Sequence, residues 1–164
     1  MKNNRTKKIV LTSMFASIIF IATYILKINF TSNAYFHLGD SMILLCTVFL
    51  PSGYAAIAVS GACLADLLSG FAIYIPFTLI IKALMTLVLT NKGRIVSPRN
   101  VTGALLSALI NILGYYTATS IIFNTQTAII NIPWDIAQSL CSIVLFFILG
   151  FVTDKTNLKN KLFI

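Results

Sequence analysis

The ionisable side chains that could do chemistry in this chain are few, and most of them fall in one apolar stretch. The 164 residues include only four acids and one histidine. His37, Asp40 and Asp66 precede Lys82, which lies near the middle of the apolar run 73–90. A charge at the centre of a membrane helix costs roughly 2.5–3.5 kcal/mol on insertion scales. We therefore expect the functional site to lie in this stretch.

The composition predicts that membrane helices position these residues. Apolar residues make up 58% of the chain and charged residues 10%, and the mean hydropathy is +0.92. Several apolar runs approach the ~20 residues needed to cross a bilayer, and none shows the alternating period of a membrane strand. The predicted fold class is an all-α membrane protein that forms a single integral membrane domain over residues 1–164.

The net charge of +8 is sorted along the chain rather than scattered. Ten of the 12 basic residues precede the first apolar run, separate the fourth from the fifth, or follow the sixth: Lys2, Arg5, Lys7, Lys8, Lys92, Arg94, Arg99, Lys155, Lys159 and Lys161. With six spans, all three groups fall on one side, which the positive-inside rule makes cytoplasmic. This placement predicts that both termini are cytoplasmic, and it argues against a nucleic-acid partner.

Six spans follow from the apolar runs and the turn residues between them. Their approximate bounds are 9–26, 40–50, 54–69, 74–89, 101–123 and 133–152. Asp40 and Pro133 suit helix starts, as an N-cap and a first-turn residue. Residues 27–39 and 124–132 are then outside loops. The second span is short, which predicts either a tilted helix or ordered loop structure in front of it.

This topology gathers the polar residues in the outer half of the membrane, where we interpret them as a substrate pocket reached from outside. The candidate substrate-binding residues are His37, Asp40, Asp66, Tyr74, Lys82, Asn111, Tyr115, Trp134, Asp135 and Gln138. Asp154 is the one acid predicted at the cytoplasmic edge.

Structural roles stay open for several of these candidates. Asp66 and Lys82 could form an ion pair between adjacent antiparallel helices, and such a pair could still bind a ligand. Asp40 could be only a helix cap, and His37 could be a solvated loop residue. Asn111 could hydrogen-bond between helices. The aromatic candidates could belong to the belt that membrane proteins place at the lipid–water interface.

Several catalytic and metal-binding patterns are absent from the sequence. Without G-x-x-x-x-G-K-[ST] the chain cannot hydrolyse ATP by that route, and neither G-x-S-x-G nor H-E-x-x-H occurs. The string HLGD lacks the first glycine and the Tyr-Asp partner of intramembrane aspartyl proteases. With one histidine and no C-x-x-C, we expect no metal site, and Cys46, Cys63 and Cys141 are interpreted as buried apolar side chains. We expect no enzyme activity and no cofactor.

Two strings, YFHLGDSMILL at 35–45 and LADLLSGFAIYIPFTLIIKAL at 64–84, resemble the substrate-binding S components of energy-coupling factor (ECF) vitamin transporters. The Gly-Asp, Ala-Asp-Leu-x-x-Gly and Pro-Phe-Thr-x-x-x-Lys patterns are similar to the riboflavin/hydroxymethylpyrimidine-type branch. The resemblance implies a six-helix bundle in the membrane of a prokaryotic cell. It also implies a vitamin pocket in the outer half, which the loop between the first two helices closes.

Small residues recur four apart in the first span, at Thr12 and Ala16 and at Ser13 and Ser17. Such faces let helices approach closely. The resemblance implies that this face docks on a transmembrane T component, that two ABC ATPases drive the cycle, and that the S component topples to release substrate inside. Threonine and serine are mixed here into the alanine pattern usual in the family, which leaves the docking register open.

The candidate residues also indicate the kind of substrate. Aromatic faces suit a flat ring, while carboxylates and amides suit ring N–H and hydroxyl groups. We expect a small, neutral or weakly cationic heterocycle, such as hydroxymethylpyrimidine, pyridoxine, a queuosine precursor or riboflavin. One buried cation against several acids disfavours an anion. The alternative function is a stand-alone small-solute carrier or channel.

Overall fold

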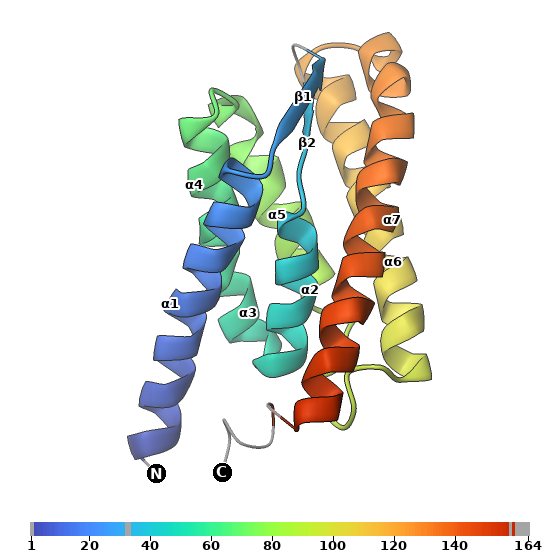
Figure 1. The fold of residues 1–164 in the computed structure, drawn as a ribbon. Helices are drawn as coiled ribbons and strands as arrows, with labels where there is room; N and C mark the ends of the chain where they lie inside the picture. Colours follow the sequence, from blue (N-terminus) through green and yellow to red (C-terminus); the bar gives the residue numbers. More distant parts are fainter. Residues whose placement is uncertain (1, 32–33, 158, 160–164) are drawn as a thin grey trace.

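Helices make up most of the computed structural model, which describes residues 2–31, 34–157 and 159 (Figure 1). In the described chain the order is α1 (Lys2–Tyr24), β1 (Ile28–Thr31), β2 (Ala34–Phe36), α2 (Gly39–Phe49), α3 (Ser52–Ala58), α4 (Ser60–Leu68), η1 (Ala72–Tyr74), α5 (Ile75–Met85), α6 (Pro98–Ile122) and α7 (Thr125–Thr156). Within this described part, α1, α6 and α7 contain stretches long and apolar enough to cross a membrane. Three shorter apolar helical segments accompany them: α2, α3 with α4, and η1 with α5. The predicted all-α membrane character is confirmed.

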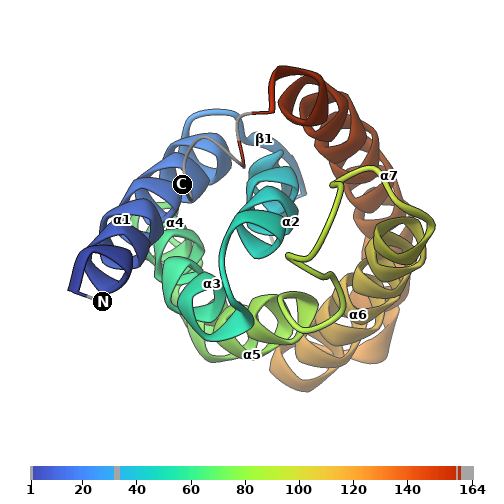
Figure 2. The same cartoon turned by 90° about the horizontal axis from the view of Figure 1, so that it is seen from below.

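Helix α2 lies in the middle of the bundle, and the other helices surround it (Figure 2). Nine of its 11 residues are buried, including Ile43, Leu44 and Val48. A helix that is apolar all round is stable only when neighbours cover every face. The central position therefore explains why this segment is hydrophobic, and it brings Asp40 in the first turn of α2 into the interior.

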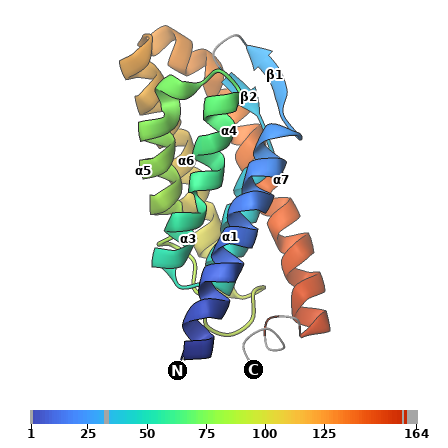
Figure 3. The same cartoon turned by 90° about the vertical axis from the view of Figure 1, so that its left-hand side faces the viewer.

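A two-stranded antiparallel hairpin precedes α2, with Ile28 paired to Phe36 and Asn29 to Tyr35. This arrangement agrees with the ordered loop expected before the short second span. The hairpin lies at one end of the bundle, and the start of α1 and the end of α7 lie at the other (Figure 1). Figure 3 shows the same separation from the side.

The predicted roles of Pro133 and Asp40 at helix starts are wrong. Helix α7 begins at Thr125, after Asn124 accepts a 2.8 Å hydrogen bond from the Thr127 N–H as N-cap, so the predicted outside loop 124–132 is largely helical. Pro133 lies inside this helix rather than in its first turn. Proline is tolerated there because neighbouring groups in a bundle can replace the one lost backbone bond. Asp40 is not an N-cap either, because α2 starts after Leu38 and has no side-chain cap.

Helix α1 packs closely on α4. A Cβ added to Gly61 would lie 2.0 Å from the Ala16 carbonyl oxygen, so this contact requires glycine. The predicted docking residues consequently fall on two faces of α1. Ser13 and Ser17 are exposed, whereas Thr12 is buried and Ala16 is half-buried against the bundle.

The loop between α5 and α6 is fastened at the end of the bundle where α1 starts. Asp154 of α7 accepts hydrogen bonds from the Ile95 and Val96 N–H groups at 3.0 and 2.9 Å. Asn100 accepts from the Thr90 N–H at 2.9 Å and donates to the Ile95 carbonyl at 3.1 Å. Lys92, Arg94 and Arg99 are exposed there, while Lys161 lies outside the described residues.

Candidate functional site

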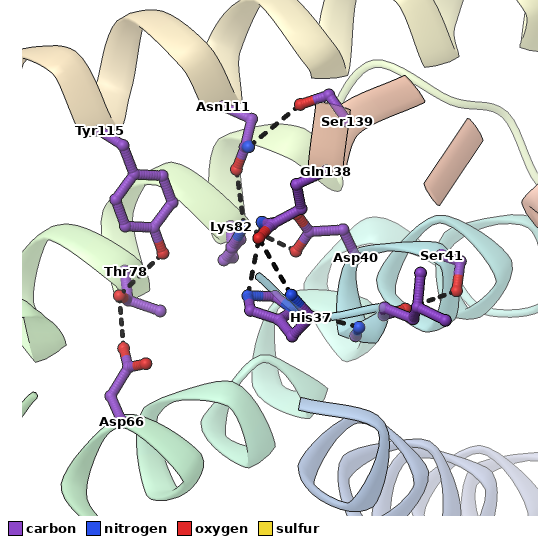
Figure 4. Close-up of polar contacts among 12 residues, drawn as sticks. His37, Asp40, Ser41, Asp66, Thr78, Lys82, Asn111, Tyr115, Gln138 and Ser139 are labelled. Carbon is purple, nitrogen blue, oxygen red and sulfur yellow. Dashed lines mark hydrogen bonds and ion pairs between the residues drawn. The ribbon is translucent and has the colours of Figure 1, made fainter. Parts of the chain in front are cut away.

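Lys82 is fully buried and forms an ion pair with Asp40. The Lys82 Nζ lies 2.6 Å from Asp40 Oδ1 and donates a second bond of 2.6 Å to Asn111 Oδ1. It also lies 4.9 Å from the centroid of the Tyr115 ring. The lysine comes from α5, the aspartate from α2 and the asparagine from α6 (Figure 4). The buried partner of Lys82 is thus Asp40 and not Asp66.

The pair belongs to a larger hydrogen-bonded network around the start of α2. Gln138 of α7 donates to Asp40 Oδ2 at 3.0 Å and accepts from the His37 N–H at 3.2 Å. The His37 Nδ1 accepts from the Gly39 N–H at 3.1 Å, and Asn111 donates to Ser139 Oγ at 3.2 Å. Buried polar groups need such partners because each unpaired one is costly away from water. The network therefore ties the central helix to α5, α6 and α7.

Asp66 organises a second polar cluster nearer the hairpin. It accepts hydrogen bonds from the Tyr35 hydroxyl and, at 2.6 Å, from Thr78 Oγ1. The Thr78 hydroxyl also lies 3.0 Å from the Tyr115 hydroxyl, as Figure 4 shows. Lys27 donates to Ser69 Oγ at 2.8 Å. The Tyr35–Asp66 and Lys27–Ser69 bonds both connect the hairpin region to the end of α4.

Aromatic rings continue from the hairpin into the bundle. The centroids of Tyr35 and Phe71 are 4.9 Å apart, those of Phe71 and Tyr74 are 6.4 Å apart, and those of Tyr74 and Tyr115 are 6.2 Å apart. All three contacts are tilted, at distances where ring pairs attract one another. We call these four residues the aromatic wall, because they form the apolar side of the cavity described next.

A cavity lies between the aromatic wall and α7. Its empty volume is about 460 Å³, part of it open to solvent, and about 50 Å³ of it can hold the centre of a water molecule. Six of the ten predicted substrate-binding residues line it: His37, Asp66, Tyr74, Tyr115, Asp135 and Gln138. Four lining residues were not predicted: Tyr35, Phe71, Thr119 and Asn131. Helical spacing could have found two of these, since Thr119 follows Tyr115 by four residues and Asn131 precedes Asp135 by four.

The other four predicted residues do not line the cavity. Asp40, Lys82 and Asn111 are buried in the adjoining network, each no more than 1% exposed. Trp134 is 38% exposed on the outside of α7. Trp134 follows Pro133 inside α7, so its indole lies well within the helix and not at its first turn.

Two titratable groups in the segment before α2 have shifted pKa values. Burial lowers the pKa of His37 to about 4, although the nearby Asp40 carboxylate opposes the shift. The imidazole is therefore neutral near pH 7, and its Nδ1 is free of a proton, as the bond from the Gly39 N–H requires. Burial and the Asp66 carboxylate both raise the pKa of the Tyr35 hydroxyl, which stays a hydrogen-bond donor.

An apolar helical bundle with a polar cavity at one end defines a membrane protein that binds a small molecule. The chain belongs to the family of S components of ECF-type transporters, because the model described as "ECF-type riboflavin transporter, S component" matches residues 3–155. This family supplies substrate-binding subunits of vitamin-type transporters, which are transport proteins and not enzymes.

One relative comes from Pyrococcus woesei and is described as "Uncharacterized protein in gap 3'region". It is 29% identical over 134 residues, which cover 76% of this chain and 85% of the relative. No solved structure matches the chain.

Proposed function

We propose that the chain captures a small heterocyclic vitamin or precursor from outside the cell and delivers it inward as part of an ECF-type ABC importer. The single membrane domain crosses the bilayer six times in the membrane of a prokaryote, with both termini in the cytoplasm. The observation that carries this proposal is the cavity lined by six of the predicted residues, within a chain matched by the S-component family over residues 3–155.

The charge distribution supports this orientation. The exposed basic residues Lys92, Arg94 and Arg99 lie in the loop and helix start at the end of the bundle where α1 begins, and Lys155 ends α7 there. The cavity, in contrast, is lined by Tyr35 of the hairpin, which lies at the other end of the bundle. With the basic end in the cytoplasm, the positive-inside rule puts the cavity in the outer half of the membrane.

The packing beside the cavity favours capture over free passage. Lys82 and Asp40 are fully buried, and their network with Asn111 and Gln138 fills the interior between α2, α5, α6 and α7. A solute that crossed the bundle would have to separate this ion pair, and leaving a buried charge unpaired costs several kcal/mol.

Delivery of the substrate then requires partner proteins, because a subunit with a closed interior must move as a whole to expose its cavity to the cytoplasm. A transmembrane T component and two ABC ATPases are the partners that the family setting suggests. The exposed Ser13 and Ser17 on α1 are the best-placed of the predicted docking residues, since their neighbours Thr12 and Ala16 face the bundle.

The test compares the purified chain with the complete complex in liposomes. The chain alone should bind a member of a panel of hydroxymethylpyrimidine, pyridoxine and riboflavin, measured by thermal shift, without moving it across the bilayer. Uptake should require the T component, both ATPases and ATP. Rapid equilibration of substrate by the chain alone would instead establish the stand-alone carrier.

A further inference from the structure

One side of the cavity carries hydrogen-bonding groups that the protein itself leaves unused. Asn131, Asp135 and Gln138 line the cavity from α7 at spacings of four and three residues, which places them on one face of the helix. Gln138 is already bonded to Asp40 and His37. Asp135 makes no hydrogen bond or ion pair with any residue that the structure describes, and the Asn131 side chain, 3% exposed, has none either.

The remaining polar groups of the cavity are occupied. Both oxygens of Asp66 accept bonds, one from Tyr35 and one from Thr78. The Tyr74 hydroxyl lies 3.1 Å from Thr119 Oγ1. The free acceptors of the cavity are therefore concentrated on α7, at Asp135 and Asn131.

The cavity wall contains acidic side chains. Its lining residues include two carboxylates, Asp66 and Asp135, and no lysine or arginine among the residues that the structure describes. Lys82 does not line the cavity, and its ammonium group is paired with Asp40 at 2.6 Å. An unpaired, half-buried carboxylate has lost part of its hydration, so a donor that replaces the lost water is bound strongly.

We infer that Asp135 and Asn131 are the specificity-determining pair of this cavity, and that they select a flat nitrogen heterocycle whose edge presents N–H donors, neutral or protonated. The inference rests on the proposed function and names its substrate class. The ring packs on the aromatic wall, Asp135 accepts from an exocyclic amino group, and the Asn131 amide donates to or accepts from the neighbouring ring atom. A phosphate ester of the same ring, or a derivative that carries a free carboxylate, is rejected, since no lysine or arginine among the described lining residues offsets its charge.

The experiment uses three matched probes on the full chain in detergent or nanodiscs: hydroxymethyl-aminopyrimidine, its oxo analogue in which a carbonyl replaces the amino group, and its phosphate ester. Calorimetry should show the amino compound binding at least tenfold more tightly than the oxo analogue and at least a hundredfold more tightly than the ester. Equal or tighter binding of the ester overturns the inference without any mutation.

Asp135→Asn keeps the size of the side chain and removes its charge. It should weaken binding of the amino compound at least tenfold and change binding of the oxo analogue less than twofold. Gln126→Lys is the matched control, because it changes the net charge by the same +1 at an exposed position of α7 that does not line the cavity. An Asp135→Asn protein that binds the amino compound like the wild type overturns the inference.

Riboflavin and pyridoxine separate this inference from the proposed function. If either compound binds the wild type tightly and its affinity is unchanged by Asp135→Asn, the proposed function as a binding subunit is supported. The inference that Asp135 and Asn131 determine specificity is then overturned. If none of the five compounds shifts the melting temperature of the wild type, both are overturned.

Discussion

Lys82 can carry a charge inside the bundle because a carboxylate, an amide and an aromatic ring surround its ammonium group. Asp40 and Asn111 each lie 2.6 Å from Nζ, and the Tyr115 ring lies 4.9 Å away. Such a pair adds little net stability, but removing one partner leaves the other charge buried and unpaired. The residue is thus a structural element beside the cavity rather than a part of its wall.

Lys82→Met should therefore destabilise the protein by about 3–5 kcal/mol, because Asp40 would remain charged and unpaired. The double variant Lys82→Met with Asp40→Leu should recover a large part of this loss. Unfolding by heat or denaturant in detergent measures both, and Lys27→Met is the control, since its bond to Ser69 lies in a less buried place. A Lys82→Met protein that folds normally but has lost ligand binding would show that the lysine contacts substrate.

His37 makes stability depend on pH through its neutral, buried imidazole. Its pKa falls from 6.5 to about 4 on folding, so the folded state disfavours the proton that the unfolded state accepts. This contribution is fully present above pH 6.5 and is lost as the pH falls toward 4. It amounts to at most about 3.5 kcal/mol, from about 1.4 kcal/mol per pKa unit over the 2.5 units between 6.5 and about 4.

His37→Asn should flatten the part of the pH profile that His37 controls, because an amide oxygen can accept the Gly39 N–H bond without titrating. The measurement is the melting temperature of both proteins between pH 7.5 and pH 4, and the quantity of interest is their difference. Parallel curves over this range would contradict a buried neutral histidine.

At the scale of the elements, α2 and α1 have different roles: α2 belongs to the interior network, and α1 presents an exposed face. Helix α2 lies inside the bundle and carries Asp40 to the network, while the hairpin before it brings Tyr35 to Asp66. Helix α1 packs one face on α4 through Gly61 and exposes the other. Its exposed face combines Ser13 and Ser17 with Val10, Met14 and Ile21, which is the mixture that lets a second helix approach in a membrane.

Ser17→Trp should abolish or strongly reduce uptake by the complete complex, because an indole would hold the partner helix away from this face. Ligand binding by the isolated chain should stay within twofold of wild type. Thr117→Trp on α6 is the matched control, since both hydroxyls are exposed and bond a carbonyl four residues back. Normal uptake by the Ser17→Trp complex would show that the docking surface lies elsewhere.

At the scale of the whole molecule, the cavity and the basic residues lie toward opposite ends of one bundle. The hairpin and the start of α7 form the first end. The loop held by Asp154 belongs to the second. This polarity predicts which positions face the outside of the cell.

Cysteine labelling tests that prediction in a background where Cys46, Cys63 and Cys141 are replaced by alanine. A membrane-impermeant maleimide should label Thr125→Cys in intact cells, and it should label Lys92→Cys only after permeabilisation. Both positions are exposed, so access differs only through the membrane. Labelling of Lys92→Cys in intact cells would reverse the proposed orientation.

Much of this organisation could be predicted from the sequence because it depends on quantities local to the chain. Apolar run length predicted where the helical segments lie and their order, although the predicted span 54–69 is divided into α3 and α4, and the span 74–89 corresponds to the end of η1 followed by α5. The clustering of scarce polar residues predicted a common site, and six of ten candidates line the cavity. Pro133 misled the prediction, because proline marks helix starts in soluble proteins but is accepted within a packed membrane helix.

The choice of partners was decided only by the tertiary structure. Sequence spacing places Asp66 and Lys82 near the same depth, which allows an ion pair between them. Helix α2, however, lies inside the ring of the other helices, so Asp40 rather than Asp66 pairs with Lys82. Asp66 instead accepts hydrogen bonds from Tyr35 and Thr78. Hydropathy fixes how deep a residue lies and periodicity fixes which face of its helix it occupies, but which neighbouring helix that face meets depends on how all the helices pack together.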